Sequence, residues 1–187
     1  MSRPKPPNPA KLVVGLLMKD KQLLSSVVAH LVEKYGTPDL VSAWLDFNYT
    51  AYYEPEMGSP LFRRIFSFTS LIDQQSLAGI KHATNDIETV YCTDNRRRVN
   101  IDPGYLLNER FVLATGKNFA HRIYVGQNIY ADLTLVYVKG AYRSLEWTYP
   151  DYASRDIIRF LDRVRRKYNI DLKNREGKAQ ATGTHMQ

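Results

Sequence analysis

The sequence contains a single cysteine, Cys92, and no apolar run close to the length of a membrane-spanning helix. A lone cysteine excludes an internal disulfide and an all-cysteine metal site, as is usual in a reducing compartment. A helix needs about 20 apolar residues to cross a bilayer. The first residues, 1–7, also lack the apolar core of a signal peptide. These absences predict a cytoplasmic protein with no membrane partner.

The sequence also lacks the short motifs of several enzyme classes. Lys117 follows Gly116, but no glycine precedes this pair at P-loop spacing, and Asn118 stands where Ser or Thr would hold Mg²⁺. The dinucleotide motif G-x-G-x-x-G, the zinc-protease motif H-E-x-x-H and the hydrolase motif G-x-S-x-G are all missing. No zinc-ligand spacing links the four histidines, His30, His82, His121 and His185. A P-loop GTPase and these three enzyme classes therefore have no local support.

Positive charge is concentrated at the two ends of the chain, whose net charge is +7. From Arg155 onward there are nine basic residues against four acidic ones, and the first eleven residues contain three basic and no acidic ones. An excess of basic residues raises nucleic acid or another polyanion as a partner. The remaining residues, 12–154, have a net charge near zero, so the body of the protein lacks a large basic excess.

Length and a hydrophobic content of 44% suit one domain. We expect a proline-rich extended lead over residues 1–10 and one globular α+β domain over residues 11–172. Residues 173–187 are polar, show no apolar periodicity and are expected to form a disordered tail.

Hydrophobic periodicity predicts an antiparallel or mixed sheet with helices packed on it. Apolar residues at helical spacing predict a helix ending at Gly36 and helices over residues 76–91 and 154–168. Apolar runs and alternation predict strands over residues 12–18, 41–53, 61–69, 96–102, 111–117, 122–125 and 129–138. Pro103-Gly104 is expected to turn the chain.

The order of these elements favours a particular arrangement. The first six match the βαββαβ plan of ferredoxin-like folds, followed by an extra β-meander and a C-terminal helix. A different antiparallel sheet with helices on one face fits the same order and stays open as an alternative.

Charged and planar side chains recur beside apolar ones in several blocks. The blocks are Glu56-Met57-Gly58, Lys81-x-x-x-Asn85-x-x-Glu88, Arg98-x-Asn100-x-Asp102-Pro103-Gly104-Tyr105, Lys117-x-x-x-His121-Arg122-x-Tyr124 and Trp147-Thr148-Tyr149-Pro150-Asp151-Tyr152. Their E-M-G, D-P-G-Y, H-R-I-Y and W-T-Y-P-D-Y segments closely resemble the bacterial family catalogued as domain of unknown function 4416, over residues 11–168. The resemblance implies no established activity. One departure is Asp132, which ends N-I-Y-A-D where the family usually has G-I-Y-A-E.

Basic side chains interleaved with aromatic residues are more numerous than the register of the strands requires. The six are Arg64, Lys81, Arg98, Lys117, His121 and Arg122. Contacts to a phosphate or carboxylate are expected from Arg64, Lys81, Arg98, Lys117 and Arg122. Further ligand contacts are expected from Asn85, Asn100, Tyr124, Trp147 and Tyr149. Glu56 is a candidate ligand for a divalent metal ion, which would be the cofactor. The candidate catalytic residues are His121, Asp102 and Glu88, with His121 as proton carrier because histidine titrates near neutral pH.

Each of these residues also has an ordinary structural explanation. Ion pairs at strand ends fix register, and a histidine on a turn usually hydrogen-bonds a neighbouring backbone group. Asp102 fits ordinary turn chemistry, and Asp151 fits a helix cap.

Three functions remain open at this point. The leading hypothesis is a protein that binds, or binds and converts, a phosphorylated or nucleotide-like anionic small molecule. The alternatives are an RNA-binding module, which would stack bases on exposed aromatic residues of the sheet, and a protein-interaction or assembly domain.

Overall fold

The computed structural model describes residues 1–183, with side chains through Arg175. The strands are β1 (Ala10–Met18), β2 (Pro38–Val41), β3 (Leu45–Phe47), β4 (Leu61–Ile72), β5 (Cys92–Thr93), β6 (Arg96–Arg97), β7 (Val99–Leu106), β8 (Arg110–Thr115), β9 (Arg122–Gly126), β10 (Ile129–Val138) and β11 (Ala141–Ser144). The helices are α1 (Leu24–Tyr35), α2 (Glu54–Met57), α3 (Leu77–Val90) and α4 (Arg155–Gly183), and short 3₁₀ turns at Lys21–Leu23 and Gln74–Ser76 precede α1 and α3.

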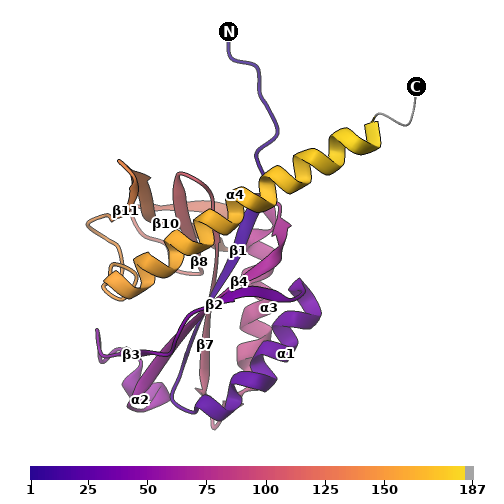
Figure 1. Ribbon diagram of the computed structural model, residues 1–187. Helices are drawn as coiled ribbons and strands as arrows, with labels where there is room; N and C mark the ends of the chain where they lie inside the picture. The colour runs from indigo at the N-terminus through magenta and orange to yellow at the C-terminus, as the bar shows by residue number, and fades with distance from the viewer. Residues whose placement is uncertain (184–187) are drawn as a thin grey trace.

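These elements form a large antiparallel sheet with helices on both faces, which confirms the α+β class (Figure 1). The strand order is β11-β10-β8-β7-β1-β4-β2, with β3 also paired to β4 and β9 also paired to β10. A separate two-stranded ribbon consists of β5 and β6. No helix within residues 1–183 combines the length and apolar character needed to span a membrane.

The central strand, β1, is buried along its whole length, which explains its continuous apolar sequence. On one face, Leu12 and Leu16 belong to the same buried cluster as Val27 of α1 and Ile87 of α3. On the other face, Val13 belongs to a cluster that includes the inward residues of α4, which are Ile157, Phe160, Leu161, Val164 and Tyr168. Helices α1 and α3 therefore cover one side of the sheet, and α4 covers the other.

The expected strand over residues 41–53 is wrong. Two short strands, β2 and β3, pair with separate stretches of β4, and the chain then turns into α2. After Phe47 the alternate positions Tyr49 and Ala51 are exposed, so no buried face holds these residues in a strand. The alternation of polar and apolar residues here belongs to a surface loop.

The expected turn at Pro103-Gly104 is also wrong, because β7 runs straight through both residues. The N–H and C=O of Ile101 point away from β1 and bind side chains of α3. Pro103 lies two residues further along β7, so its backbone nitrogen also points away from β1, toward the β8 side. Pairing with β8 begins only at Gly104, and the missing N–H of Pro103 therefore costs no ladder hydrogen bond. Gly104 brings the two strands close together, since a Cβ there would lie 2.3 Å from the carbonyl oxygen of Val112.

Two further differences concern the C-terminal half. The expected meander is modified, because β8 pairs with β10, and β9 lies on the opposite edge of β10. The last helix, α4, continues past Tyr168 to Gly183, through most of the segment expected to be a disordered tail. Residues 173–182 consist mainly of Lys, Arg, Glu, Ala and Gln, which favour helix even without an apolar stripe. Residues 184–187 lie outside the described residues.

Two glycine variants test this packing. Gly104→Ala is expected to destabilise the protein by about 2 kcal/mol or more, because the added methyl collides with backbone of β8. Gly79→Ala, in the exposed face of α3 where a Cβ meets nothing within 4 Å, is expected to stabilise it by about 0.5–1 kcal/mol. Urea unfolding measures both changes. An unaltered midpoint for Gly104→Ala would contradict the β7–β8 register.

Candidate functional site

A buried arginine that the sequence did not single out, Arg63, holds the polar groups between the sheet and the start of α4. Its Nη1 lies 3.1 Å from Oδ2 of Asp102, and its Nε lies 2.7 Å from Oδ2 of Asp151. Its side chain is 4% exposed and lies over the rings of Phe47 and Tyr152. Arg63, Asp102, Asp151, Phe47 and Tyr152 are called the Arg63 cluster below. The ion pairs of this cluster join β4, β7 and the turn before α4.

The Arg63 cluster depends on a glycine in β1. Gly15 pairs with Asp102 on one side, while the next residue on the same face, Leu17, pairs with Arg63 on the other. A Cβ at Gly15 would lie 2.6 Å from the Tyr152 hydroxyl and 2.9 Å from Nη1 of Arg63. The missing side chain therefore provides the space in which Arg63 reaches diagonally across β1 to Asp102.

The two carboxylates of the Arg63 cluster have different electrostatic surroundings. Burial raises the pKa of Asp102, but the charges of Arg63 and Lys81 outweigh burial and hold this pKa below its ordinary value. Burial also raises the pKa of Asp151, and here Arg63 offsets it only in part. Asp102 is therefore an ionised carboxylate, and its side chain is 22% exposed.

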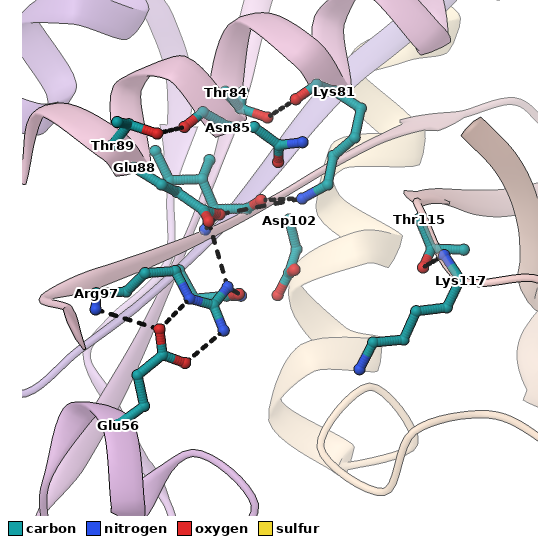
Figure 2. A network of polar contacts seen from close by, with 12 residues as sticks. Glu56, Lys81, Thr84, Asn85, Glu88, Thr89, Arg97, Asp102, Thr115 and Lys117 are labelled. Carbon is teal, nitrogen blue, oxygen red and sulfur yellow. Dashed lines mark hydrogen bonds and ion pairs between the residues drawn. The ribbon is translucent and has the colours of Figure 1, made fainter. Parts of the chain in front are cut away.

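A second group, the Arg97 cluster, consists of Arg97, Glu56, Glu88 and Asn100 (Figure 2). Nε and Nη2 of Arg97 bind the two oxygens of Glu56 at 2.7 and 2.8 Å. Nη1 donates to Asn100 at 2.9 Å and to Glu88 at 3.2 Å. The hydrogen bonds from Arg97 lower the pKa of Glu56 against the opposing effect of its burial. Glu56, the candidate metal ligand, is thus engaged by an arginine.

Two residues of α3 satisfy the backbone of the unpaired part of β7. The Ile101 N–H donates to Oε1 of Glu88 at 2.6 Å, and Nζ of Lys81 donates to the Ile101 carbonyl at 2.8 Å. Figure 2 shows both side chains reaching from the helix to the strand, with Asn85 beside Lys81. Burial raises the pKa of Glu88. Lys81 and Glu88 therefore replace the strand that β7 lacks here, which is a structural task.

A third group, the His121 cluster, consists of His121, Arg122, Asp132, Trp147 and Tyr149. Oδ2 of Asp132 lies 3.3 Å from Nε2 of His121 and accepts from Nε of Arg122 at 2.9 Å. Nη2 of Arg122 donates to the Tyr149 hydroxyl at 2.7 Å. The His121 ring is stacked on the indole of Trp147, with centroids 4.7 Å apart and planes 9° from parallel. The shorter carboxylate of Asp132 therefore reaches both His121 and Arg122.

The His121 cluster adjoins an open hollow of about 570 Å³, lined by Phe119, Ala120, His121, Glu146 and Trp147. Lys117 belongs to the same loop as Phe119. Nη1 of Arg122 donates to the backbone carbonyl oxygen of Lys117 at 2.9 Å. The Lys117 ammonium donates to the Tyr52 hydroxyl at 2.7 Å, and this contact lowers the pKa of Tyr52. The loop thus carries an exposed cation whose ammonium contacts Tyr52, and an aromatic residue, Phe119, that lines the hollow.

The structure does not gather all the expected anion contacts in one place. Arg64 lies on the face of β4 opposite to Arg63 and stacks on Trp44. Arg98 pairs with Asp20 at an exposed position. Tyr124 is exposed on β9 and contacts Tyr130. Lys81, Asn85 and Asn100 lie with the Arg97 cluster, whereas Lys117, Arg122, Trp147 and Tyr149 lie at or beside the His121 cluster.

Sequence reasoning missed Arg63 and Arg97, the arginines at the centres of the first two clusters. Arg63 stands beside Arg64, and the neighbouring residues on both faces of β4 are apolar, so alternation gives no sign of which arginine is buried. Arg97 lies within the run Arg96-Arg97-Arg98, in which only tertiary contacts distinguish the three residues. Within residues 1–183, no group of three or more His, Cys, Asp or Glu side chains is placed to hold a metal ion.

Comparison with protein families gives one result. The model of the family described as "Domain of unknown function (DUF4416)" matches residues 8–168. The chain belongs to this family. The DUF4416 match covers all three clusters and ends within α4, and it confirms the resemblance carried by the sequence blocks. No curated protein and no solved structure matches the chain.

The two adjacent arginines of β4 offer a matched test of the Arg63 cluster. Arg63→Met is expected to destabilise the protein by about 3–5 kcal/mol, because two carboxylates lose their buried partner. Arg64→Met removes the same charge from a residue stacked on Trp44 and is expected to cost about 1 kcal/mol or less. Urea unfolding at pH 7 measures the difference.

The pH dependence of the same variant has a defined sign. Because the pKa of Asp102 is lowered in the folded wild type, its contribution to stability is present above the unfolded value of about 3.9 and is lost as pH falls through the folded value. Without Arg63, burial is opposed only by Lys81 and the hydrogen bond from Asn100, so the pKa of Asp102 is expected to be higher than in the wild type. The stability deficit of Arg63→Met is therefore expected to shrink as pH falls from about 7 to about 3. A constant deficit would contradict this electrostatic role.

Proposed function

We propose that this DUF4416 protein binds a small molecule that has a planar ring and an anionic group, such as a nucleotide, at the His121 cluster. The observation that carries the proposal is the parallel stack of His121 on Trp147 at the wall of the open hollow. The proposed ligand places its ring in the hollow and its anionic group toward Lys117.

The aromatic side chains of the hollow suit a planar ring. Phe119 and Trp147 are 64% and 39% exposed, so their surfaces are accessible to a ligand. The indole N–H of Trp147 donates to the carbonyl of Leu133 at 2.8 Å, which holds the ring in place. The volume of about 570 Å³ lies in the usual range for small-molecule sites. Glu146, which also lines the hollow, offers a hydrogen-bond acceptor to the ring.

Glu146 is the acidic residue in the lining of the hollow, so the proposed anionic group lies outside the hollow, on the side of the Lys117 loop. Within the described part of the chain, Asp132 is the carboxylate that Arg122 contacts, and the other two nitrogens of Arg122 bind neutral oxygens. Lys117 donates to the neutral hydroxyl of Tyr52. A phosphate could take the place of this hydroxyl and gain a charge-assisted hydrogen bond. The positive charge of Lys117 is therefore the proposed anion contact.

His121 is the proposed proton carrier for any conversion of the bound molecule. Its side chain is 11% exposed and lies at the hollow, and Asp132 orients its ring. The other two catalytic candidates have separate tasks, since Glu88 binds the backbone of β7 and Asp102 pairs with Arg63. Binding is thus the primary proposal, and proton transfer by His121 is its extension.

We also propose that the first part of the fold has the ferredoxin-like βαββαβ arrangement. The antiparallel order β7-β1-β4-β2, with α1 and α3 on the same face, supports it. The residues of the His121 cluster all follow β8, so the proposed site lies in the C-terminal part of the chain, after the ferredoxin-like arrangement.

The proposal is tested by titrating the protein with ribonucleotides, the matching nucleosides and inorganic phosphate. Fluorescence is read in a Trp44→Phe background, because Trp147 is then the remaining tryptophan. At least one nucleotide is expected to quench Trp147 and raise the melting temperature. Phe119→Ala is expected to weaken binding about tenfold, since stacking on a base contributes about 1–3 kcal/mol.

Two charge variants distinguish the proposed anion contact from a general effect of charge. Lys117→Ala is expected to weaken nucleotide binding and leave nucleoside binding unchanged. Arg98→Ala removes an equal charge at the remote pair with Asp20 and serves as the control. Absence of any response to the ribonucleotides, or equal losses in Lys117→Ala and Arg98→Ala, would contradict the proposal.

A further inference from the structure

The outer face of α4 has a line of arginines. Arg155, Arg159, Arg163 and Arg166 are spaced by four, four and three residues, and all four are exposed. At about 100° per residue this spacing places them along one side of the helix. With a rise of about 1.5 Å per residue, the line is about 17 Å long. We call these four residues the arginine stripe. Figure 1 shows α4 lying across the sheet and extending beyond it.

The arginine stripe differs from the other cations of α4. Lys167 pairs with Asp39 and Asp171, and Arg165 donates to the carbonyl of Asn108 and stacks on Tyr137. These two cations face the body of the protein and have partners there. Within the part of the chain that the structure describes, the ion pairs of α4 involve none of the four stripe arginines.

Two acidic residues of α4 offset part of the charge of the stripe. Asp156 is exposed next to Arg155, and the half-buried Asp162 lies on the same side of α4 as the stripe, one turn from Arg159 and from Arg166. Neither carboxylate lies within 4.0 Å of a stripe guanidinium in the described residues. The stripe is therefore a surface of concentrated positive charge, which attracts a partner with regularly spaced negative charges.

The packing of α4 decides between two kinds of anionic partner. A helix that binds a lipid surface inserts its apolar face between the headgroups. The apolar face of α4 is instead buried against the sheet, where residues such as Leu161 and Val164 have no measurable exposure. The stripe can offer charge to a partner but no apolar surface, and charge alone suits a nucleic acid backbone.

We infer that the arginine stripe binds the phosphodiester backbone of a nucleic acid. At about 3.4 Å per phosphate along one strand, a line of 17 Å runs beside about five phosphates. Guanidinium groups bind phosphate oxygens in paired hydrogen bonds, and such contacts position a nucleic acid without reading its bases. This surface is independent of the hollow at the His121 cluster, because its residues are on α4 and face solvent.

The inference is tested with the full chain and labelled 20-nucleotide RNA, single-stranded DNA and duplex DNA, by fluorescence anisotropy at several salt concentrations. For four phosphate contacts to a single strand, affinity is expected to fall about 50-fold between about 50 and about 200 mM salt. In the double variant Arg159→Gln with Arg163→Gln, the fall is expected to be about sevenfold. Glutamine preserves helix propensity, so α4 stays intact.

The matched control is the double variant Lys34→Gln with Arg96→Gln. Both residues are exposed, Lys34 lies on α1 across the sheet from α4, and the change in net charge is identical. The control is expected to keep the salt dependence of the wild type. Three outcomes would overturn the inference. They are an equal loss of affinity in the two double variants, binding whose affinity does not change with salt, and binding to anionic vesicles without binding to any of the three nucleic acids. The three probes separate RNA from DNA as the source of the backbone.

Discussion

The buried ion pairs of Arg63 fix the relative positions of three distant segments of the chain. Arg63 lies on β4, Asp102 on β7 and Asp151 in the turn before α4, and none of these charges is well solvated. Removing one partner from such a group costs about 3–5 kcal/mol, because the remaining charge stays buried. The turn that includes Trp147 and Tyr149 leads directly to Asp151, so the Arg63 cluster also sets where the wall of the hollow lies.

A second buried cation attaches α4 at the other end of β1. Lys11 is fully buried, and its ammonium pairs with Asp39 and, at 2.6 Å, with Asp171 of α4. Asp39 also accepts from Ser67 at 2.5 Å. With the Arg63 cluster near its beginning and the Lys11 pairs near residue 171, α4 is held at two points. The two attachments fix the orientation of α4 about its own axis. In this orientation the apolar residues of α4 face the sheet and the arginine stripe faces solvent.

Sequence patterns predicted the elements whose burial is regular and failed where tertiary contacts decide. The apolar run of β1 and the stripe of α3 follow directly from burial on two faces and on one face. Pro103-Gly104 has the composition of a turn, but the two residues lie in a strand because the neighbouring edge is unpaired on one side of Pro103. His121 and Trp147 are 26 positions apart, and only the pairing of β9 and β10 and the turn after β11 bring their rings together.

The distribution of partners among the cations separates structural charges from those open to a ligand. Lys11, Arg63 and Arg97 each contact two carboxylates, and these contacts largely neutralise them. Lys117 contacts a neutral hydroxyl, and the stripe arginines face solvent. An incoming anion gains little from a cation that already has two carboxylates, because it must displace them or be repelled by them. The excess positive charge of the chain is therefore available to ligands at the loop beside the hollow and along α4, and it is there that binding is expected.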